Sequence, residues 1–300
     1  MQADNYHSLT IVLAKPDAKT IRKLTDILGG QAGFTLINMH MLSPDKVIDL
    51  HITPTPQLSN TIEHLLHSHN VKADFCIQPL KGRKKKLLIC DMDSTLIGQE
   101  CIDELADFAG VKTQVSKITE RAMRGHIDFE VALKERVELL KGLPLTDLQT
   151  CFDQRITLNS GAKTLCQTMK ANGAKTVIVS GGFTFFTSRI ATLSGFEHHH
   201  ANTLIEDGER LSGKVGLPIL GRNAKKVSLI KYSQDLGGAH CAIAIGDGAN
   251  DLAMIMASGL GIAYRAKPIV AKAAHCAINY TDLTTALYFQ GYNDDDFIET

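Results

Sequence analysis

The stretch LLICDMDSTL, residues 87–96, decides the fold that we expect. Its four leading apolar residues predict a short buried strand, and the polar run that starts at Asp91 follows directly. Ligands of an open parallel sheet bind beyond the carboxyl ends of its strands, so Asp91 and Asp93 stand where a site is expected. Two carboxylates this close repel each other in a dry pocket unless a cation neutralises them or one holds a proton.

Three further segments place polar residues at the end of a strand or the start of a helix. TVIVSGGF, residues 176–183, brings Ser180 and Gly181 to a helix start, where a hydroxyl and backbone N–H groups form an anion site. AIAIGDGANDLAM, residues 242–254, sets Asp247 at a strand end and Asp251 about one helical turn later. GRNAKKVSLI, residues 221–230, places Lys225 near a helix start as a point charge for a phosphoryl oxygen.

Together these segments predict a phosphoryl-transfer site with a hard cation. Asp91, Asp247 and Asp251 supply oxygen ligands without a nearby histidine or thiolate, which favours Mg²⁺. Each segment alone is more often a turn with solvated acids or a surface lysine. Their conjunction in one β/α region favours the catalytic interpretation.

Hydrophobic periodicity divides the chain into two domains. Residues 8–80 alternate in the order β-α-β-β-α-β, which predicts a small α+β domain over residues 1–80. Residues 81–300 form an α/β domain with a parallel sheet. Within it we expect a helical cap at 101–155 and a β-hairpin at 201–218 that turns at Asp207 and Gly208.

Composition excludes several classes of partner. The chain has 32 basic and 32 acidic side chains, so no global field directs it to nucleic acid or to a membrane surface. The first seventeen residues lack the pattern of an export signal, and no later apolar run reaches membrane-spanning length. Seven scattered cysteines without C-x-x-C spacing favour reduced thiols, so we expect a cytoplasmic protein.

Three polar runs receive ordinary structural interpretations. The basic run KGRKKK, residues 81–86, has no interleaved aromatic residues and is expected to be a solvated linker. His198, His199 and His200 are expected to form a solvated run near a loop. The acidic run NDDDF, residues 293–297, is expected to be a frayed terminus.

The motifs DMDSTL, SGG, NAK and GDGAND, in this order and with a helical region between the first two, resemble those of the haloacid dehalogenase-like phosphatases. The resemblance covers about residues 85–290 and implies a Rossmann-like parallel sheet with an inserted cap. The longer strings DMDSTLIGQECIDELA and FEVALKERVELL resemble the members of that family that hydrolyse phosphoserine in the last step of serine biosynthesis. Residues 8–80 resemble an ACT-like unit by pattern.

The resemblance also implies roles for single residues. Asp91 would attack phosphorus and become an aspartyl-phosphate, while Asp93 would protonate the leaving oxygen and later accept a proton from water. Mg²⁺ would be held by the Asp91 and Asp247 carboxylates and the Asp93 carbonyl, with Asp251 orienting its waters. The phosphoryl group of the substrate would be bound by Ser180, Gly181, Lys225 and Asn250. Glu100 would bind its ammonium group and Arg136 its carboxylate. Phe129 and Met123 would form the apolar walls of the pocket.

Several alternatives stay open at this point. The substrate could be another small phosphomonoester, such as phosphohomoserine or a sugar phosphate. A catalytically inert amino-acid-binding regulator is disfavoured because Asp91, Asp93 and Asp247 are all present. A dehalogenase is disfavoured by Asp93, because halide departure requires no proton. A homodimer is the default expectation for the assembly.

Overall fold

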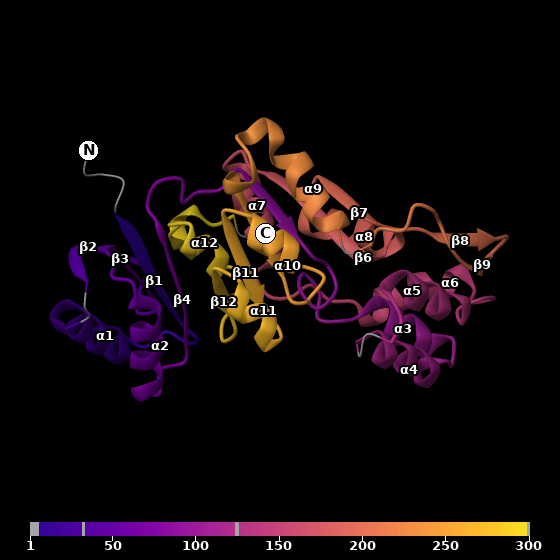
Figure 1. The fold of residues 1–300 in the computed structure, drawn as a ribbon, viewed down its shortest axis with the longest axis horizontal. Helices are drawn as coiled ribbons and strands as arrows, with labels where there is room; N and C mark the ends of the chain where they lie inside the picture. The colour runs from indigo at the N-terminus through magenta and orange to yellow at the C-terminus, as the bar shows by residue number, and fades with distance from the viewer. Residues whose placement is uncertain (1–5, 32–33, 124–125, 222, 299–300) are drawn as a thin grey trace.

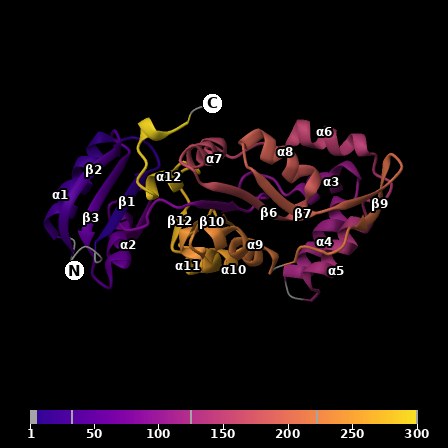
Figure 2. The same cartoon turned by 90° about the horizontal axis from the view of Figure 1, so that it is seen from above.

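The computed structural model describes residues 6–31, 34–123, 126–221 and 223–298. Figure 1 shows three parts in a row, with the N-terminal unit at one end, an α/β core in the middle and a group of helices at the other end. The view from above in Figure 2 shows the same order. The core therefore separates the N-terminal unit from the helical cap.

The N-terminal unit, residues 6–79, is a four-stranded antiparallel sheet in the order β2-β3-β1-β4. Its apolar core joins the sheet to two helices. The elements are β1 (His7–Leu13), α1 (Ala18–Gln31), β2 (Thr35–Ser43), β3 (Val47–Thr53), α2 (Leu58–Ser68) and β4 (Ala73–Pro79). This arrangement confirms the predicted order of strands and helices. The ACT-like resemblance stays a prediction.

The core contains a six-stranded parallel sheet in the order β12-β11-β10-β5-β6-β7. The strands are β5 (Leu87–Cys90), β6 (Lys175–Phe183), β7 (His198–Asn202), β10 (Ala242–Gly246), β11 (Leu260–Tyr264) and β12 (Cys276–Ile278). The predicted α/β class is confirmed. The three strands predicted from the sequence, β10, β5 and β6, are direct neighbours, so their carboxyl ends meet at one edge.

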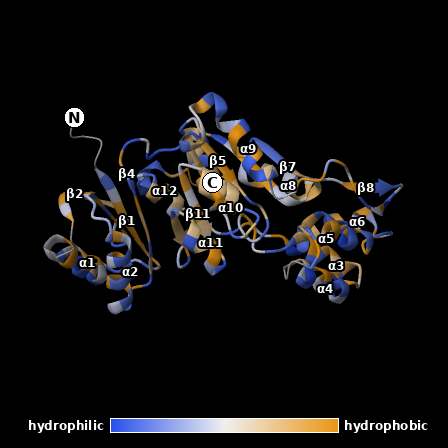
Figure 3. Cartoon of the chain, viewed as in Figure 1, coloured by the Kyte–Doolittle hydropathy of each residue, from blue (hydrophilic) through white to orange (hydrophobic). Residues whose placement is uncertain are grey.

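Helices cover both faces of this sheet, which is why its strands are apolar throughout. Leu88 and Cys90 pack toward α7 (Ala162–Ala171), α8 (Thr184–Ser194) and α12 (Thr285–Phe289). Leu87 and Ile89 face α9 (Ala224–Ser233) and α10 (Leu252–Ala257), while α11 (Pro268–Ala273) packs beside β11. In Figure 3 strands β5 and β11 are mostly orange, whereas α1 and α2 mix blue with orange.

The described part of residues 101–155 is helical as predicted, and the bounds of the cap stay a prediction. This part consists of α3 (Cys101–Phe108), α4 (Lys112–Met123), α5 (Phe129–Glu138) and α6 (Leu145–Arg155). The predicted hairpin is present as β8 (Leu204–Asp207) and β9 (Arg210–Val215), with its turn at Gly208 and Glu209, one residue later than expected. Strand β9 exchanges backbone hydrogen bonds with residues 142–145, so the hairpin ties the core to the cap.

The interpretation of residues 81–86 as a solvated linker is wrong at its centre. Arg83 is 8% exposed and donates hydrogen bonds to both carboxylate oxygens of Asp49 and to the carbonyl oxygen of Phe289. An arginine is buried in this way only where its charge and donors are matched. The segment is therefore part of the contact between the N-terminal unit and the core, and the domain boundary at residues 80 and 81 stays a prediction.

Two other polar runs are also more ordered than expected. The three histidines belong to edge strand β7, where His199 contacts the Thr187 hydroxyl and His200 contacts the Tyr232 hydroxyl. The acidic run forms the short helix η4 (Asp294–Asp296), and Tyr288 donates a hydrogen bond to Asp294. Neither run is merely solvated, because local donors and acceptors match its polar groups. Among the described helices, none is long and apolar enough to cross a membrane.

Candidate active site

The predicted acidic residues meet at the carboxyl edge of the central strands. Asp91 follows β5 and its N–H donates to the carbonyl oxygen of Ile245 on β10, so the two strand ends are in register. Asp247 follows β10, and Asp251 is the N-cap residue of helix α10. Oxygen atoms of Asp91, Asp247 and Asp251 all lie within 4.8 Å of one another. One cation can contact all three.

Lys225 connects two of these acids. Its Nζ atom lies 2.7 Å from Asp91 Oδ2 and 2.5 Å from Asp251 Oδ1, and all three side chains are buried. The other Asp251 oxygen accepts a hydrogen bond from the Gly248 N–H. Helix α9 places Lys225 in its first turn, because Ala224 is the first helical residue. A buried ammonium between two carboxylates is fixed in position and keeps its charge.

Burial governs the electrostatics of this cluster. Desolvation and the neighbouring Asp251 carboxylate raise the pKa of Asp91, although Lys225 opposes the change. Desolvation lowers the pKa of Lys225, but Asp251 and Asp91 outweigh it and raise the pKa overall. Desolvation together with Asp251 raises the pKa of Asp247 to about 6. A cation among these oxygens would favour their ionised forms.

Asp93, two residues after Asp91, is held by other partners. Its Oδ1 accepts a hydrogen bond from the Cys101 N–H and its Oδ2 accepts one from the Ser180 hydroxyl. The Ser180 oxygen itself accepts from the Gly182 N–H. A Cβ atom at Gly182 would lie 2.5 Å from Asp93 Oδ2, so glycine is the residue that this close approach allows.

The cap contributes Glu100 and Arg136. Glu100 precedes α3 and accepts a 2.6 Å hydrogen bond from Ser94, whose φ of 55° turns the loop back on itself. Desolvation of its carboxylate and the charge of the Asp93 carboxylate raise the pKa of Glu100 to about 7. Burial lowers the pKa of Arg136, while Asp103 and Glu100 raise it. The Asp103 and Glu100 carboxylates thus favour the charged form of Arg136.

The other predicted residues fall as follows. A Cβ atom at Gly181 would lie 3.2 Å from Phe129 Cζ, so the first residue of α5 reaches the strand end that carries Ser180. Asn250 lies half-buried in the loop between Asp247 and Asp251. The side chain of Met123 lies outside the described residues.

A model of the haloacid dehalogenase-like hydrolases matches residues 88–256, more than half of the chain. The chain belongs to this family.

Similar proteins of this hydrolase family include enzymes named phosphoserine phosphatase. The one from Saccharomyces cerevisiae is 38% identical over 242 residues, which cover 80% of this chain and 78% of the relative. The one from Polaromonas sp. is 46% identical over 206 residues, covering 67% of this chain and 87% of the relative.

Solved structures of this hydrolase family are also similar. A family hydrolase from Salmonella enterica serovar Typhi superimposes with a TM-score of 0.81 at 31% identity and covers 96% of this chain and 99% of its own. A substrate-bound phosphoserine phosphatase complex superimposes with a TM-score of 0.64 at 40% identity and covers 69% of this chain and 98% of its own.

Sequence reasoning missed three supports of the hydrolase site. Thr95 is fully buried and its hydroxyl donates to Asp247 Oδ1 at 3.3 Å. Asn202, at the end of β7, donates to the Gly181 carbonyl oxygen and so fixes the strand end beside Ser180. The Cys101 N–H orients Asp93. Thr95 stands within the DMDSTL motif, but nothing near Asn202 in the sequence connects it with Gly181.

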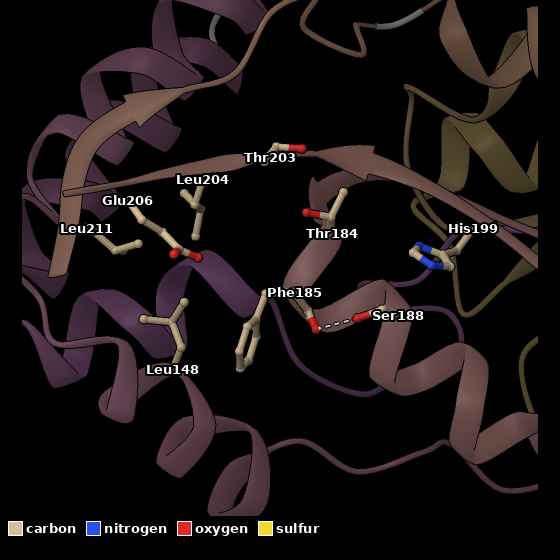
Figure 4. Close-up of a pocket in the computed structure, with 9 residues that line it drawn as sticks. All are labelled: Leu148, Thr184, Phe185, Ser188, His199, Thr203, Leu204, Glu206 and Leu211. Atoms are coloured by element: carbon tan, nitrogen blue, oxygen red, sulfur yellow. Dashed lines mark hydrogen bonds between the residues drawn. The ribbon is translucent and has the colours of Figure 1, made fainter. Parts of the chain in front are cut away.

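One groove of this hydrolase lies away from these residues. It measures about 320 Å³ and runs between α6, α8 and the hairpin. Figure 4 shows Leu148, Phe185 and Glu206 facing one another across it. None of the predicted catalytic residues lines it. The candidate active site is instead the acidic cluster with Lys225, together with Asp93 and Ser180.

Proposed function

We propose that this protein is a Mg²⁺-dependent phosphatase that hydrolyses O-phospho-L-serine, the last step of serine biosynthesis. The observation that carries the proposal is the meeting of Asp91, Lys225 and Asp247 at one sheet edge, where Asp93 accepts a hydrogen bond from Ser180. Glu100 precedes the first cap helix, and Arg136 lies on cap helix α5. A phosphoryl group needs the first set, and an amino acid head group needs the second.

The donor atoms fit Mg²⁺. The acids present carboxylate oxygens within reach of one cation, and no histidine or thiolate belongs to the cluster that they form. Asp91 and Asp247 would hold the ion together with the Asp93 carbonyl, and Asp251 would orient its waters. When bound, the ion neutralises negative charge that develops on the phosphoryl oxygens.

Asp91 performs the first displacement in this mechanism. One of its oxygens forms a bond to phosphorus while the bond from phosphorus to the serine oxygen breaks. The electron pair of that bond goes to the serine oxygen, which takes a proton from Asp93. Ser180, the Gly181 N–H and Lys225 bind the phosphoryl oxygens. Among the described residues, Asp91 and Asp251 are the ion-pair partners of Lys225, so one of its three N–H donors remains for the phosphoryl group.

Asp93 serves again in the second displacement. It accepts a proton from water as the water oxygen bonds to phosphorus and the bond to Asp91 breaks. The Cys101 N–H and the Ser180 hydroxyl hold its two oxygens in place for both steps. Inorganic phosphate is then the leaving product.

In this proposal two oppositely charged side chains at the cap bind the serine part of the substrate. Arg136 would bind the carboxylate in a bidentate manner, and Glu100 would bind the ammonium group. Phe129 already contacts the Gly181 strand end and would cover the bound substrate, with Met123 and Asn250 as further proposed contacts. A cap that closes in this way excludes bulk water from the aspartyl-phosphate.

Phosphate release from L-phosphoserine, measured with Mg²⁺ and with EDTA, tests the proposal. We expect turnover with Mg²⁺ and none with EDTA. Parallel assays with phosphothreonine, phosphohomoserine and sugar phosphates decide the substrate, because another preferred phosphomonoester would replace phosphoserine. Absence of turnover on every ester, together with binding of serine, would instead support an inert amino-acid-binding regulator.

The setting of the enzyme is also a proposal. All seven cysteines are free thiols and six are buried, which supports a reducing compartment such as the cytoplasm. We also propose that residues 1–80 form an ACT-like domain that can mediate a homodimer. Size-exclusion chromatography with light scattering tests the dimer.

A further inference from the structure

The two segments that connect the cap to the core pair with each other. The first runs from the catalytic loop to α3 at residues 94–100, and the second runs from α6 to α7 at residues 156–161. Ile97 and Leu158 form an isolated antiparallel bridge, and the Asn159 N–H donates to the Leu96 carbonyl oxygen at 2.8 Å. The second segment thus lies directly against the loop that carries Asp93.

Asn159 makes the most specific contact in this pairing. Its Nδ2 donates to the carbonyl oxygen of Thr95 at 2.8 Å, so its side chain and main chain bind two successive peptide groups of the loop. Thr95 in turn donates to Asp247. Asn159 therefore restrains the part of the loop that runs from Asp93 to Thr95, and Thr95 is the residue that contacts Asp247.

The residue that follows Asn159 is fixed by hydrogen bonds to the core. The hydroxyl of the next residue, Ser160, donates to Asp282 Oδ2 at 3.0 Å, and the Leu283 N–H donates to the Ser160 carbonyl oxygen. The loop that contains Asp282 is anchored in turn by Asp74 of the N-terminal unit, whose carboxylate accepts from three of its backbone N–H groups. Asp74 is buried, and a buried carboxylate whose acceptors are matched in this way rigidifies the loop that it binds.

We propose that Asn159 is a positioning residue that fixes the catalytic loop for phosphoryl transfer. The inference rests on the proposed function, because the loop matters only if Asp93 and Asp247 act on a phosphoryl group. Asn159 acts through Thr95 and touches neither substrate nor reacting atoms. Displacing a catalytic carboxylate by as little as 1 Å is enough to slow a reaction about a hundredfold.

The experiment compares Asn159→Ala and Asn159→Asp with Asn172→Ala. Asn159→Asp keeps the size and the main-chain bond but places an acceptor against the Thr95 carbonyl oxygen. Asn172 makes the same kind of bond, from Nδ2 to the Thr168 carbonyl oxygen at 2.9 Å, at the far end of α7. We expect both Asn159 variants to lose about 10- to 100-fold in kcat with KM for phosphoserine changed less than twofold. The control should retain the wild-type kcat.

A second readout does not depend on turnover. Because Thr95 holds Asp247, the rise in Tm on adding Mg²⁺ should be smaller for both Asn159 variants than for wild type and Asn172→Ala. A lower Tm with unchanged kcat and an unchanged Mg²⁺ shift would overturn the proposal, since it would show a purely structural role. An inactive wild-type protein would sink the proposed function, while an undiminished Mg²⁺ shift in the variants would separately sink the role of Asn159.

Discussion

Asp91 and Asp93 have identical side chains, yet their surroundings differ at the residue scale. Asp91 is 5% exposed and is paired with the Lys225 ammonium, whereas Asp93 is more exposed and accepts from a backbone N–H and a hydroxyl. A fixed carboxylate beside a cationic group suits a nucleophile, and a carboxyl group held by neutral donors suits an acid that gains and loses a proton.

Replacing Asp91 by asparagine tests this division of roles. An amide cannot displace the serine oxygen, so Asp91→Asn should reduce phosphate release about 10⁴-fold or more and abolish the phosphoenzyme seen after acid quenching. Asp235→Asn, on the exposed helix η2 (Gln234–Leu236), serves as the control and should change neither. Phosphate release near the wild-type rate in Asp91→Asn would refute the nucleophile.

The raised pKa of Glu100 predicts a pH dependence of stability in the metal-free protein. Its ordinary pKa of 4.5 rises to about 7 in the fold because its carboxylate is desolvated and lies near the Asp93 carboxylate. The folded state therefore holds a proton that the unfolded chain releases, and this contribution to stability is lost as pH rises from about 4.5 to about 7. Glu100→Gln removes it.

Urea unfolding in EDTA measures this effect. The free energy of unfolding of Glu100→Gln relative to wild type should increase between about pH 4.5 and 7 and stay constant above that range. A difference between the two proteins that is the same at every pH would contradict the raised pKa.

The candidate site residues at the strand ends were predictable, because phosphoryl transfer restricts their residue types. The residues that hold these strand ends in place by hydrogen bonds were not predictable. Asp91, Ser180 and Asp247 each end an apolar run, so the sequence alone marks them. Asn202 is equally fixed, but it reaches Gly181 from β7 across a distance of 21 residues in the chain. Only the packing of the two strands reveals that contact.

At the scale of elements, burial on two faces separates the predictable strands from the others. Strands β5, β6 and β10 occupy the centre of the sheet and are therefore apolar in sequence. Strand β7 reads HHHAN because it lies at an edge, where one side of the strand faces helix α8 or solvent. Strand β12 has only three residues. A pattern based on burial cannot identify such edges.

The contacts of Arg136 within the cap support a role in substrate specificity. Arg136 on α5 donates to the Thr119 hydroxyl of α4 and to the Ala132 carbonyl oxygen, so its guanidinium is held inside the cap. Arg136→Ala should raise KM for phosphoserine at least tenfold and leave KM for an aryl phosphate nearly unchanged, because only phosphoserine has a carboxylate to lose.

A second arginine of the cap provides the control for Arg136→Ala. Arg121 on α4 pairs with Glu135 on the exposed surface, an interaction that contributes about 0.2–1 kcal/mol at most. Arg121→Ala should therefore leave both KM values unchanged. Equal effects of Arg136→Ala on the two substrates would remove Arg136 from carboxylate recognition.

At the scale of the whole molecule, a buried polar contact joins the N-terminal unit to the core. Arg83 pairs with both oxygens of Asp49 at 2.8 and 2.6 Å, and it also donates to Thr10 and to the Phe289 carbonyl oxygen. The sequence of the basic run did not indicate that Arg83 would be buried. Its neighbours Lys81, Lys84 and Lys86 carry the same charge and are exposed. Charge alone cannot tell which member of such a run will fold inward.

Removing Arg83 should leave Asp49 buried without its cation. Arg83→Met is expected to lower the free energy of unfolding by about 3–5 kcal/mol, because the lone carboxylate loses its compensation. Urea unfolding at pH 8 measures the loss, since burial lowers the pKa of the neighbouring His51 and leaves that ring neutral there. Adding Asp49→Leu should recover most of the stability, and Lys86→Ala should change it by less than about 0.5 kcal/mol. A loss below about 1 kcal/mol in Arg83→Met would mean that this pair does not fasten the N-terminal unit to the catalytic core.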